Sequence, residues 1–464
     1  MSGIKDSYVK LNADKRQRLL AHCEQVNDFE SDLAQRLAES AQRFRQFLER
    51  HLPQLQENNL QENSSHHSPL DSHSNHATES LDNLEQQQRQ TLQELLQQEQ
   101  TQLTDLTTYP VNQQAHRLQQ IEQQLTCRLA EQQRHFQQQY RRLYQSQLER
   151  RQTEDTLAEL WLNRLRRLGL QLAAHSGLDY QPVGFLNSLD ETLTQCDQYY
   201  QRGYYQAALA TSHEAYLRAQ QHFFELEQGQ FIHTAWQGLI QHHVDQLRAK
   251  IDVQKQAQFR IRSGQQEVLI AADIDYWTEG KLSQLEQKLN DLTQYFSTSQ
   301  LPLAELKNMV AQLEQQQQQL SQLTHDAQAA LIASQLRHNM GQIISHSLAN
   351  AGWEVIDATY AQEDYRRAMH LKLRNYQGDE IVTIIQPETR RENTLAAHLN
   401  IGFFEQTIDE TARQRRLQQI IRALQQQGLS PTPPTCRPGT EQQRATERQW
   451  LDFERARRRR TDSH

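Results

Sequence analysis

Leucine and other apolar residues recur at steps of three and four over most of this chain, with glutamine and charged residues between them. This spacing is typical of helices that bury one narrow apolar stripe. It predicts an N-terminal helix within residues 1–53, a helical hairpin over 80–176 that turns at Pro110, a helical-hairpin region over 177–300 and a helix over 301–330. Because narrow apolar seams favour association between helices, we expect elongated coiled-coil arms.

Within the second hairpin region, the stretch from Gly203 to Leu209, followed by Ala215, resembles one half of a tetratricopeptide repeat. Glycine permits close contact between two helices there, and small residues fill their interface. The pattern does not recur at the period of such repeats, and several repeats are needed for a stable array. The resemblance therefore implies a single helical hairpin.

The apolar pattern changes to a period of two near the C-terminus, which predicts four short strands at Trp353–Tyr360, Met369–Arg374, Ile381–Ile385 and Leu395–Phe403. The second of these alternates strictly, so it has one dry and one wet face. The third is almost entirely apolar, which favours a central position in the sheet. The apolar end of the preceding helix and a helix over residues 408–424, stopped by Gly428, flank the strands. We therefore predict a mainly α chain with a small C-terminal α+β domain over residues 331–428, a four-stranded antiparallel meander flanked by helices.

Two stretches lack the apolar residues that would offset the entropy of ordering them. Residues 54–79 are rich in Asn, Ser and His and are predicted to be a disordered linker. Residues 429–464 begin rich in Pro and end rich in Arg, and are predicted to be a flexible tail. The histidines of the first stretch do not predict a metal site, because nothing there fixes a coordination geometry.

Composition and charge narrow the choice of function class. Hydrophobic residues make up 36% of the chain, which suits narrow seams better than one large core, and the net charge of −8 gives no general attraction to nucleic acid. The four cysteines, Cys23, Cys127, Cys196 and Cys436, are isolated, as expected in a reducing compartment. No run approaches the roughly 18 apolar residues of a membrane span, so we expect a cytoplasmic protein that does not associate with a membrane.

Arginines cluster in two places near the C-terminus. The last predicted helix carries Arg413, Arg415, Arg416 and Arg422, and the tail carries Arg457, Arg458, Arg459 and Arg460. Such clusters can contact the phosphates of nucleic acid, or another anion, without reading bases. A solvated basic tail explains the same residues, and we favour it because the surplus positive charge is confined to the last few positions.

One enzymatic arrangement is compatible with the predicted sheet. In a metal-dependent nuclease, an acid on one strand and an acid-x-Lys sequence on the next hold a divalent metal and orient water. Asp357 and Lys372 fit two of these positions, but the third holds His370 instead of a carboxylate. Phosphate-binding glycine loops, a nucleophile elbow and zinc-binding cysteine pairs are missing from the sequence, so no catalytic residue, metal or cofactor is predicted.

The sequence therefore predicts a non-catalytic cytoplasmic scaffold or adaptor. Its coiled-coil helices would associate with a second copy, as a dimer or higher oligomer, because the seams exceed what one hairpin buries. The α+β domain would be presented to a protein partner as a recognition module. Two other classes stay open: a nucleic-acid-associated accessory factor that uses the arginine clusters, and a metal-dependent nuclease.

Overall fold

The computed structural model describes residues 5–11, 23–26, 30–51, 72–149, 154–174, 184–255, 258–263, 266–271, 273–298, 301–387, 396–404, 410–433, 435–436, 453 and 457. These residues form two compact units. One, the α+β unit, is drawn from Met1–Ser31, Lys250–Gln287 and Gln318–His464; the other, the helical unit, is drawn from Asp32–Ala249 and Lys288–Gln317. A mainly α chain with an antiparallel sheet near its C-terminus confirms the predicted fold class.

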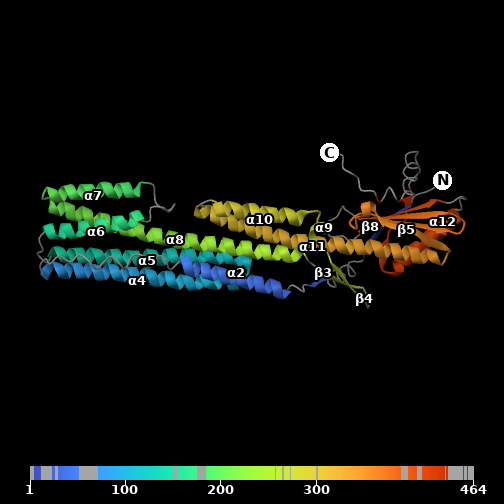
Figure 1. Ribbon diagram of the computed structural model, residues 1–464, viewed down its shortest axis with the longest axis horizontal. Coiled ribbons are helices and arrows are strands. Elements are labelled where there is room, and N and C mark those ends of the chain that lie inside the picture. Colours follow the sequence, from blue (N-terminus) through green and yellow to red (C-terminus); the bar gives the residue numbers. More distant parts are fainter. Residues whose placement is uncertain are drawn as a thin grey trace. The chain divides into compact units, whose positions relative to one another are not determined.

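Long helices make up the helical unit, and three of them, α8, α10 and α11, also contribute residues to the α+β unit. Helices α4 and α5 lie side by side (Figure 1) and are joined through a short 3-10 turn, η1, and Pro110, as the predicted hairpin requires. The helix predicted over 301–330 is the first part of α11. The helices are α2 (Glu30–His51), α4 (Ser72–Asp105), η1 (Leu106–Thr108), α5 (Val111–Glu149), α6 (Glu154–Ala174), α7 (Phe185–Gln201), α8 (Tyr205–Lys255), α10 (Lys281–Thr298) and α11 (Leu303–Ala349).

The apolar seams of these helices are buried within one chain. Leu81 and Leu103 of α4 and Leu118 and Leu125 of α5 are all buried. Trp161 lies in the same core. Beside it, Arg164 forms ion pairs with Asp82 and Glu85, and the Tyr216 hydroxyl donates a hydrogen bond to Glu85. Because the seams are already covered, these leucines give no physical reason to expect a second copy.

A short turn joins α7 and α8 where the sequence resembles half a repeat. Gly203 adopts a left-handed φ of 77° in this turn, a conformation that glycine adopts without steric cost. Ala208, Leu209 and Ala215 of α8 are buried in the core of the helical unit. Helices α7 and α8 are consecutive, and α7 packs closely against α6, where a Cβ at Gly169 would lie 3.6 Å from the side chains of Leu189 and Leu193.

The main sheet contains the predicted antiparallel meander. Its strands are β5 (Trp353–Tyr360), β6 (Met369–Asn375), β7 (Glu380–Pro387) and β8 (Ala396–Phe404), each paired with the next. Met369, Leu371 and Leu373 are buried on one face of β6. A Cβ at Gly341 of α11 would lie 2.8 Å from the Met369 Cε, so α11 packs closely on this face. Helix α12 (Glu410–Gln426) follows β8.

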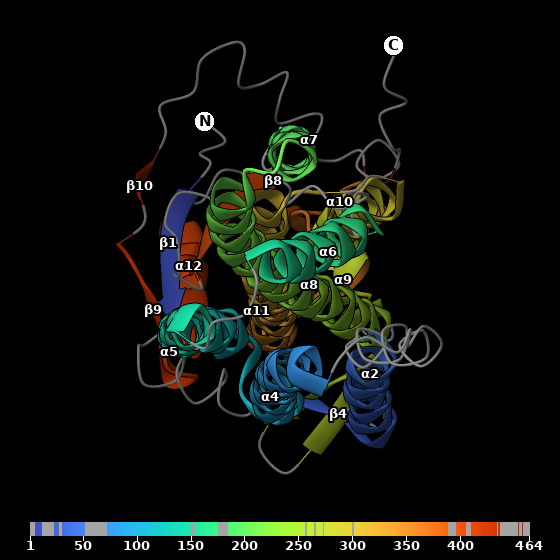
Figure 2. The same ribbon diagram turned by 90° about the vertical axis from the view of Figure 1, so that its left-hand side faces the viewer.

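Three further strands extend the sheet beyond β8. Strand β1 (Lys5–Leu11) pairs antiparallel with β8, and β9 (Leu429–Pro431) and β10 (Thr435–Cys436) pair with β1. Figure 2 shows the blue N-terminal β1 beside the red C-terminal strands. No strand was predicted within residues 1–53, where β1 precedes the expected helix, and the predicted flexible tail over 429–464 begins in the sheet. Both errors have one cause: the strand partners are distant in sequence, and tertiary pairing overrides local pattern.

A second, three-stranded antiparallel sheet also replaces predicted helix. Its order is β2-β3-β4, from Cys23–Val26, Gln258–Ser263 and Gln266–Ala271. Apolar and polar residues alternate in the Gln258–Ser263 sequence, as in a strand. The alternation is short and directly follows a long helical pattern, so the sequence favours a helix there. Helix α9 (Ile274–Trp277) follows, and the Asp273 carboxylate caps it by accepting the Asp275 N–H at 2.9 Å.

The predicted linker over 54–79 falls mostly outside the described residues. Its last part differs from the prediction, because α4 already begins at Ser72. The part of α4 from Leu81 onward is held in the core by its buried apolar residues. A helix that has already formed can extend by further residues at little cost in free energy, so α4 reaches back to Ser72.

Candidate functional site

The face of the main sheet opposite α11, here called the outer face, carries the acid and lysine singled out from the sequence. Asp357 of β5 and Lys372 of β6 are direct cross-strand neighbours. The Lys372 ammonium lies 3.0 Å from Glu380 of β7, and Arg374 also donates to Glu380, at 2.5 Å. Asp357 accepts a hydrogen bond from Arg457. The outer face thus brings the predicted pair together, but each member is bound in an ion pair.

Glu380 is a carboxylate on this face whose pairing with Lys372 the sequence did not predict. Burial opposes its ionisation, but hydrogen bonds from Arg374 and Lys372 outweigh burial and lower the pKa of Glu380. His370, which stands where a nuclease would have an acid, is half-buried and lies edge-to-face with Phe453. Within the described ranges, no three His, Cys, Asp or Glu side chains are grouped so that they could hold a metal ion.

A C-terminal residue covers part of the outer face. Phe453 is buried against Val382 and Ile384 of β7. Together with the Arg457–Asp357 ion pair, this contact ties the end of the chain to the sheet. The predicted flexible tail therefore makes these two contacts with the sheet in addition to the pairing of β9 and β10 with β1.

The arginines predicted for anion contact do not form one surface. Arg413 is buried and lies 3.8 Å from Glu410, and Arg416 stacks over the Trp353 ring at 5.2 Å. Arg415 and Arg422 of α12 are exposed. Arg457 is paired with Asp357, and the other predicted tail residues, Arg458, Arg459 and Arg460, lie outside the described residues.

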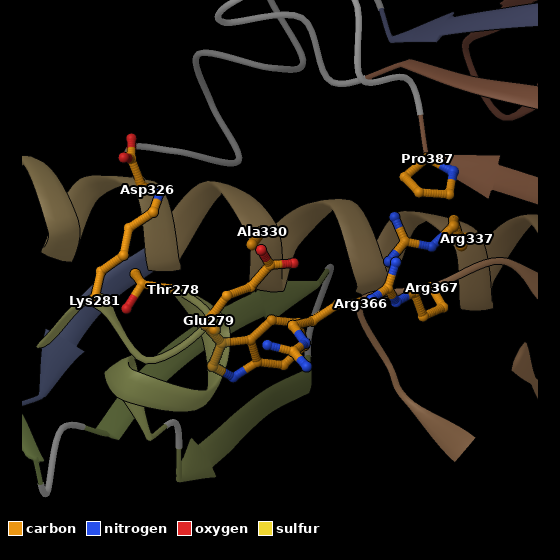
Figure 3. A pocket seen from close by; sticks show the side chains of 10 residues that line it. Thr278, Glu279, Lys281, Asp326, Ala330, Arg337, Arg366, Arg367 and Pro387 are labelled. Carbon is orange, nitrogen blue, oxygen red and sulfur yellow. The ribbon is translucent and has the colours of Figure 1, made fainter. Parts of the chain in front are cut away.

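A different group of arginines lines a cavity of about 300 Å³ in the α+β unit, here called the arginine pocket. Its walls come from the turn after α9, from α11, from the loop between β5 and β6, and from the end of β7. Figure 3 shows Arg337 and Arg367 near Pro387, Arg366 extending from the same loop toward the middle of the pocket, and Lys281, Thr278 and Asp326 at the other end. The remaining lining residues are Trp277, Glu279 and Ala330.

Arg337 is the most buried of these arginines, with only 2% of its surface exposed. Its Nη2 donates to the Tyr365 carbonyl at 2.8 Å, whereas its Nε has no hydrogen-bond partner among the described residues. Burial lowers the pKa of the Arg337 guanidinium, although nearby Tyr360 and Asp364 oppose this effect. A buried guanidinium with an unmade hydrogen bond is costly unless an acceptor reaches it.

Arg366 has a dense set of partners. Asp364 accepts from its Nε and Nη2 at 2.9 Å and 2.7 Å, and the Tyr276 carbonyl accepts from its Nη1 at 2.6 Å. The Tyr276 hydroxyl also donates to Asp364. Burial opposes ionisation of Asp364, but hydrogen bonds from Arg366 and Tyr276 outweigh it and hold the pKa of Asp364 well below its usual value. Arg367 lies farther out, with its Nε 3.8 Å from Asp364.

Strand β5 forms one edge of the described sheet, and exposed apolar side chains follow this edge. Val355 and Ile356 are 48% and 49% exposed in mid-strand. Tyr376, in the β6–β7 turn next to Gly352, is 88% exposed, and Tyr365, in the loop after β5, is also exposed. We call these four residues the β5 edge. The register shifts between Val355 and Asp357, so a bulge there exposes both Val355 and Ile356.

Sequence reasoning missed both the pocket and the edge. One signal for the pocket was present: Arg337 interrupts an apolar stretch of α11 that includes Leu336 and Met340, and a charge in such a stretch needs a partner. The adjacent Arg366 and Arg367 follow an acid in a loop, but nothing local shows that this loop meets α11.

Comparisons of the chain with protein-family models, curated proteins and solved structures gave no match. No helix in the described ranges combines the length and the apolar character needed to cross a membrane.

Proposed function

We propose that this chain is a non-catalytic recognition protein whose α+β unit binds an extended segment of a partner protein along strand β5. One observation carries the proposal: β5, the last strand in the described sheet order, has Val355 and Ile356 exposed in mid-strand, and exposed Tyr376 and Tyr365 lie in the turns near its two ends. Scattered exposed apolar residues are common on protein surfaces, but a row of them beside an unpaired strand edge is characteristic of interaction sites.

The chemistry of an edge strand suits this role. An edge strand presents backbone N–H and C=O groups that a further strand can pair with. In peptide recognition by strand addition, these main-chain hydrogen bonds give affinity, and pockets or apolar contacts for alternate side chains give specificity. Val355 and Ile356 would supply the central apolar contacts, with Tyr376 and Tyr365 near the two ends of the strand.

The bulge in β5 bears on which partners can bind. A bulge shortens the regular stretch of an edge and limits indiscriminate pairing with other strands. A partner segment must therefore accommodate the displaced Ile356, which favours selective recognition over general strand pairing.

Charge favours a protein segment over nucleic acid or a second copy. Strand β5 has two acids, Glu354 and Asp357, and no Lys or Arg; Asp357 is paired with Arg457, so Glu354 is the charge that makes the edge unfavourable for phosphates. Antiparallel pairing of two β5 strands would bring acids of both copies close together, and like charges across strands are destabilising. A segment from another protein with Lys or Arg next to apolar residues fits this edge best.

A site-specific photo-crosslinking experiment tests the proposal. A photoreactive phenylalanine replaces Tyr376 in the full-length protein in its native cells, with and without Ile356→Lys. The matched control carries the same probe at Tyr204, an exposed aromatic residue of the helical unit. We expect a cross-link at 376 to one other protein, lost with Ile356→Lys and missing at 204, because lysine places a charge in the apolar contact.

Three results would contradict the proposal. The first is a probe at 376 that gives no more cross-linking than the probe at 204. The second is a cross-link that persists unchanged with Ile356→Lys. The third is a cross-link formed solely with a second copy of the chain, which would show that β5 mediates self-association.

A further inference from the structure

The arginine pocket has binding features that recognition at the β5 edge does not use. We propose that it binds a small phosphate monoester, with the phosphate group against Arg337, Arg366 and Arg367. This inference does not depend on the function proposed for β5, because it rests on the side chains of Arg337, Arg366 and Arg367, which are not part of the β5 edge.

The buried Arg337 is the first support. Its side chain is almost completely removed from solvent, it lines the pocket, and its Nε has no hydrogen-bond partner among the described residues. Phosphate oxygens accept charge-assisted hydrogen bonds from guanidinium groups, often two at a time. An oxyanion in the pocket would therefore satisfy a donor that the described residues leave unmatched.

The charge at the arginine end distinguishes phosphate from carboxylate. Three guanidinium groups lie at this end; Asp364 is paired with Arg366, and Glu279 also acts electrostatically on Arg366, so positive charge is still in surplus there. A phosphate monoester carries about −1.5 to −2 at neutral pH, whereas a carboxylate carries one negative charge. A phosphate group also has more oxygens than a carboxylate with which to accept from several guanidinium groups.

The other end of the pocket indicates what the phosphate is attached to. Lys281 and Asp326 lie there with opposite charges, Glu279 lies between the two ends, and Trp277 supplies an aromatic wall. This end favours a neutral group with hydrogen-bond donors and a flat ring. A cavity of about 300 Å³ lies at the small end of the range for ligand pockets, which favours a small molecule. Adenosine monophosphate has these properties and serves as the probe.

A purely structural role for the arginines is the competing explanation. Arg337 and Arg366 donate to the carbonyls of Tyr365 and Tyr276, so they also hold the β5–β6 loop against α11 and α9. Arg367 separates the two explanations, because its side chain is 55% exposed and its described contact is a 3.8 Å approach to Asp364. Substitution of Arg367 should leave the fold intact and still weaken phosphate binding.

Isothermal titration calorimetry on the full-length protein at constant ionic strength tests the proposal. The titrants are adenosine monophosphate, adenosine and inorganic phosphate. We expect saturable binding of the monophosphate, weaker binding of inorganic phosphate and no binding of adenosine. Arg367→Gln should weaken monophosphate binding roughly tenfold, because it removes a charge-assisted donor. Arg415→Gln, which changes an exposed arginine of α12, should leave binding unchanged.

Four results of these titrations would contradict the proposal or a part of it. No saturable binding of either phosphate at millimolar concentration would overturn the proposal. Equal binding of adenosine and its monophosphate would show that the arginines do not hold the phosphate. Equal weakening by Arg367→Gln and Arg415→Gln would indicate nonspecific attraction to the unit. Equal affinity for inorganic phosphate and the monophosphate would contradict a role for the organic part.

Discussion

The side chain of Asp364 holds the β5–β6 loop together, and its replacement by Asn should destabilise the α+β unit. Asp364 accepts hydrogen bonds from Arg366, from the Tyr276 hydroxyl and from the Arg366 backbone N–H. The same loop contains Gln362 and Glu363 with left-handed φ values of 59° and 56°. A left-handed backbone conformation costs about 1 kcal/mol for each residue other than glycine. The loop therefore depends on the hydrogen bonds that Asp364 makes.

The expected effect of Asp364→Asn is a loss of about 2 kcal/mol in the free energy of unfolding at pH 7. Asparagine retains one acceptor oxygen but removes the charge opposite Arg366, and a hydrogen bond to a charged group contributes about 1.5–3 kcal/mol. Arg366 is partly exposed, so solvent screening keeps the effect near the lower end of this range.

Lowering the pH should reduce the difference in the free energy of unfolding between the wild type and Asp364→Asn. Since the pKa of Asp364 is lowered in the folded state from the usual 3.8, its stabilising contribution is complete above that value and is lost as the pH falls toward the folded-state pKa. At pH 3, protonation of the unfolded state should already remove about 1 kcal/mol of the difference between the wild type and Asp364→Asn.

Native-state hydrogen exchange of β6 and β7 in urea, at pH 7 and pH 3, measures these quantities within the α+β unit alone. The control is Glu354→Gln, which changes an exposed carboxylate of β5 and should alter stability by less than about 0.5 kcal/mol. The reasoning fails if Asp364→Asn behaves like this control, or if its effect does not shrink with acid.

Three further predictions concern packing and titration. Cys196 is buried, which raises its pKa to about 11, so iodoacetamide should modify the exposed Cys127 in the native protein and reach Cys196 only after unfolding, as peptide mass spectrometry would show. Burial, with a smaller contribution from Arg141, lowers the pKa of His213 to about 4, so the helical unit should lose stability as the pH falls from 6.5 to 4. Thermal melts of His213→Phe should lack that part of the pH dependence. Gly341→Leu should destabilise the α+β unit by about 1–3 kcal/mol in urea unfolding, because the added side chain meets Met369 and Ile385.

The sequence predicted those parts of the fold whose pattern is local. The alternation over Met369–Asn375 and the apolar run over Ile381–Ile385 identified β6 and β7, since each strand pairs with its neighbour in the chain. Strand β1 gave no comparable signal, because Lys5–Leu11 becomes a strand only by pairing with β8. The short alternating sequence of β3 follows a long helical pattern, so it was predicted as part of a helix.

The site was less predictable than the fold. Asp357 and Lys372 were correctly expected on adjacent strands, because alternation fixes the face on which each side chain lies. Their partners, Arg457 and Glu380, depend on the path of the tail and the register of a hairpin. The arginine pocket depends on a loop, a turn and a helix meeting in space, and composition records only that arginines are present.

The central claim is that β5 receives a strand from a partner protein, and hydrogen exchange tests it most directly. Once cross-linking has identified the partner segment, exchange of the full-length protein is compared with and without that peptide. Backbone pairing predicts slower exchange of amides within Trp353–Tyr360, and no such change when the protein carries Ile356→Lys. Unchanged exchange in β5, with protection confined to α12 or to the helical unit, would contradict the claim.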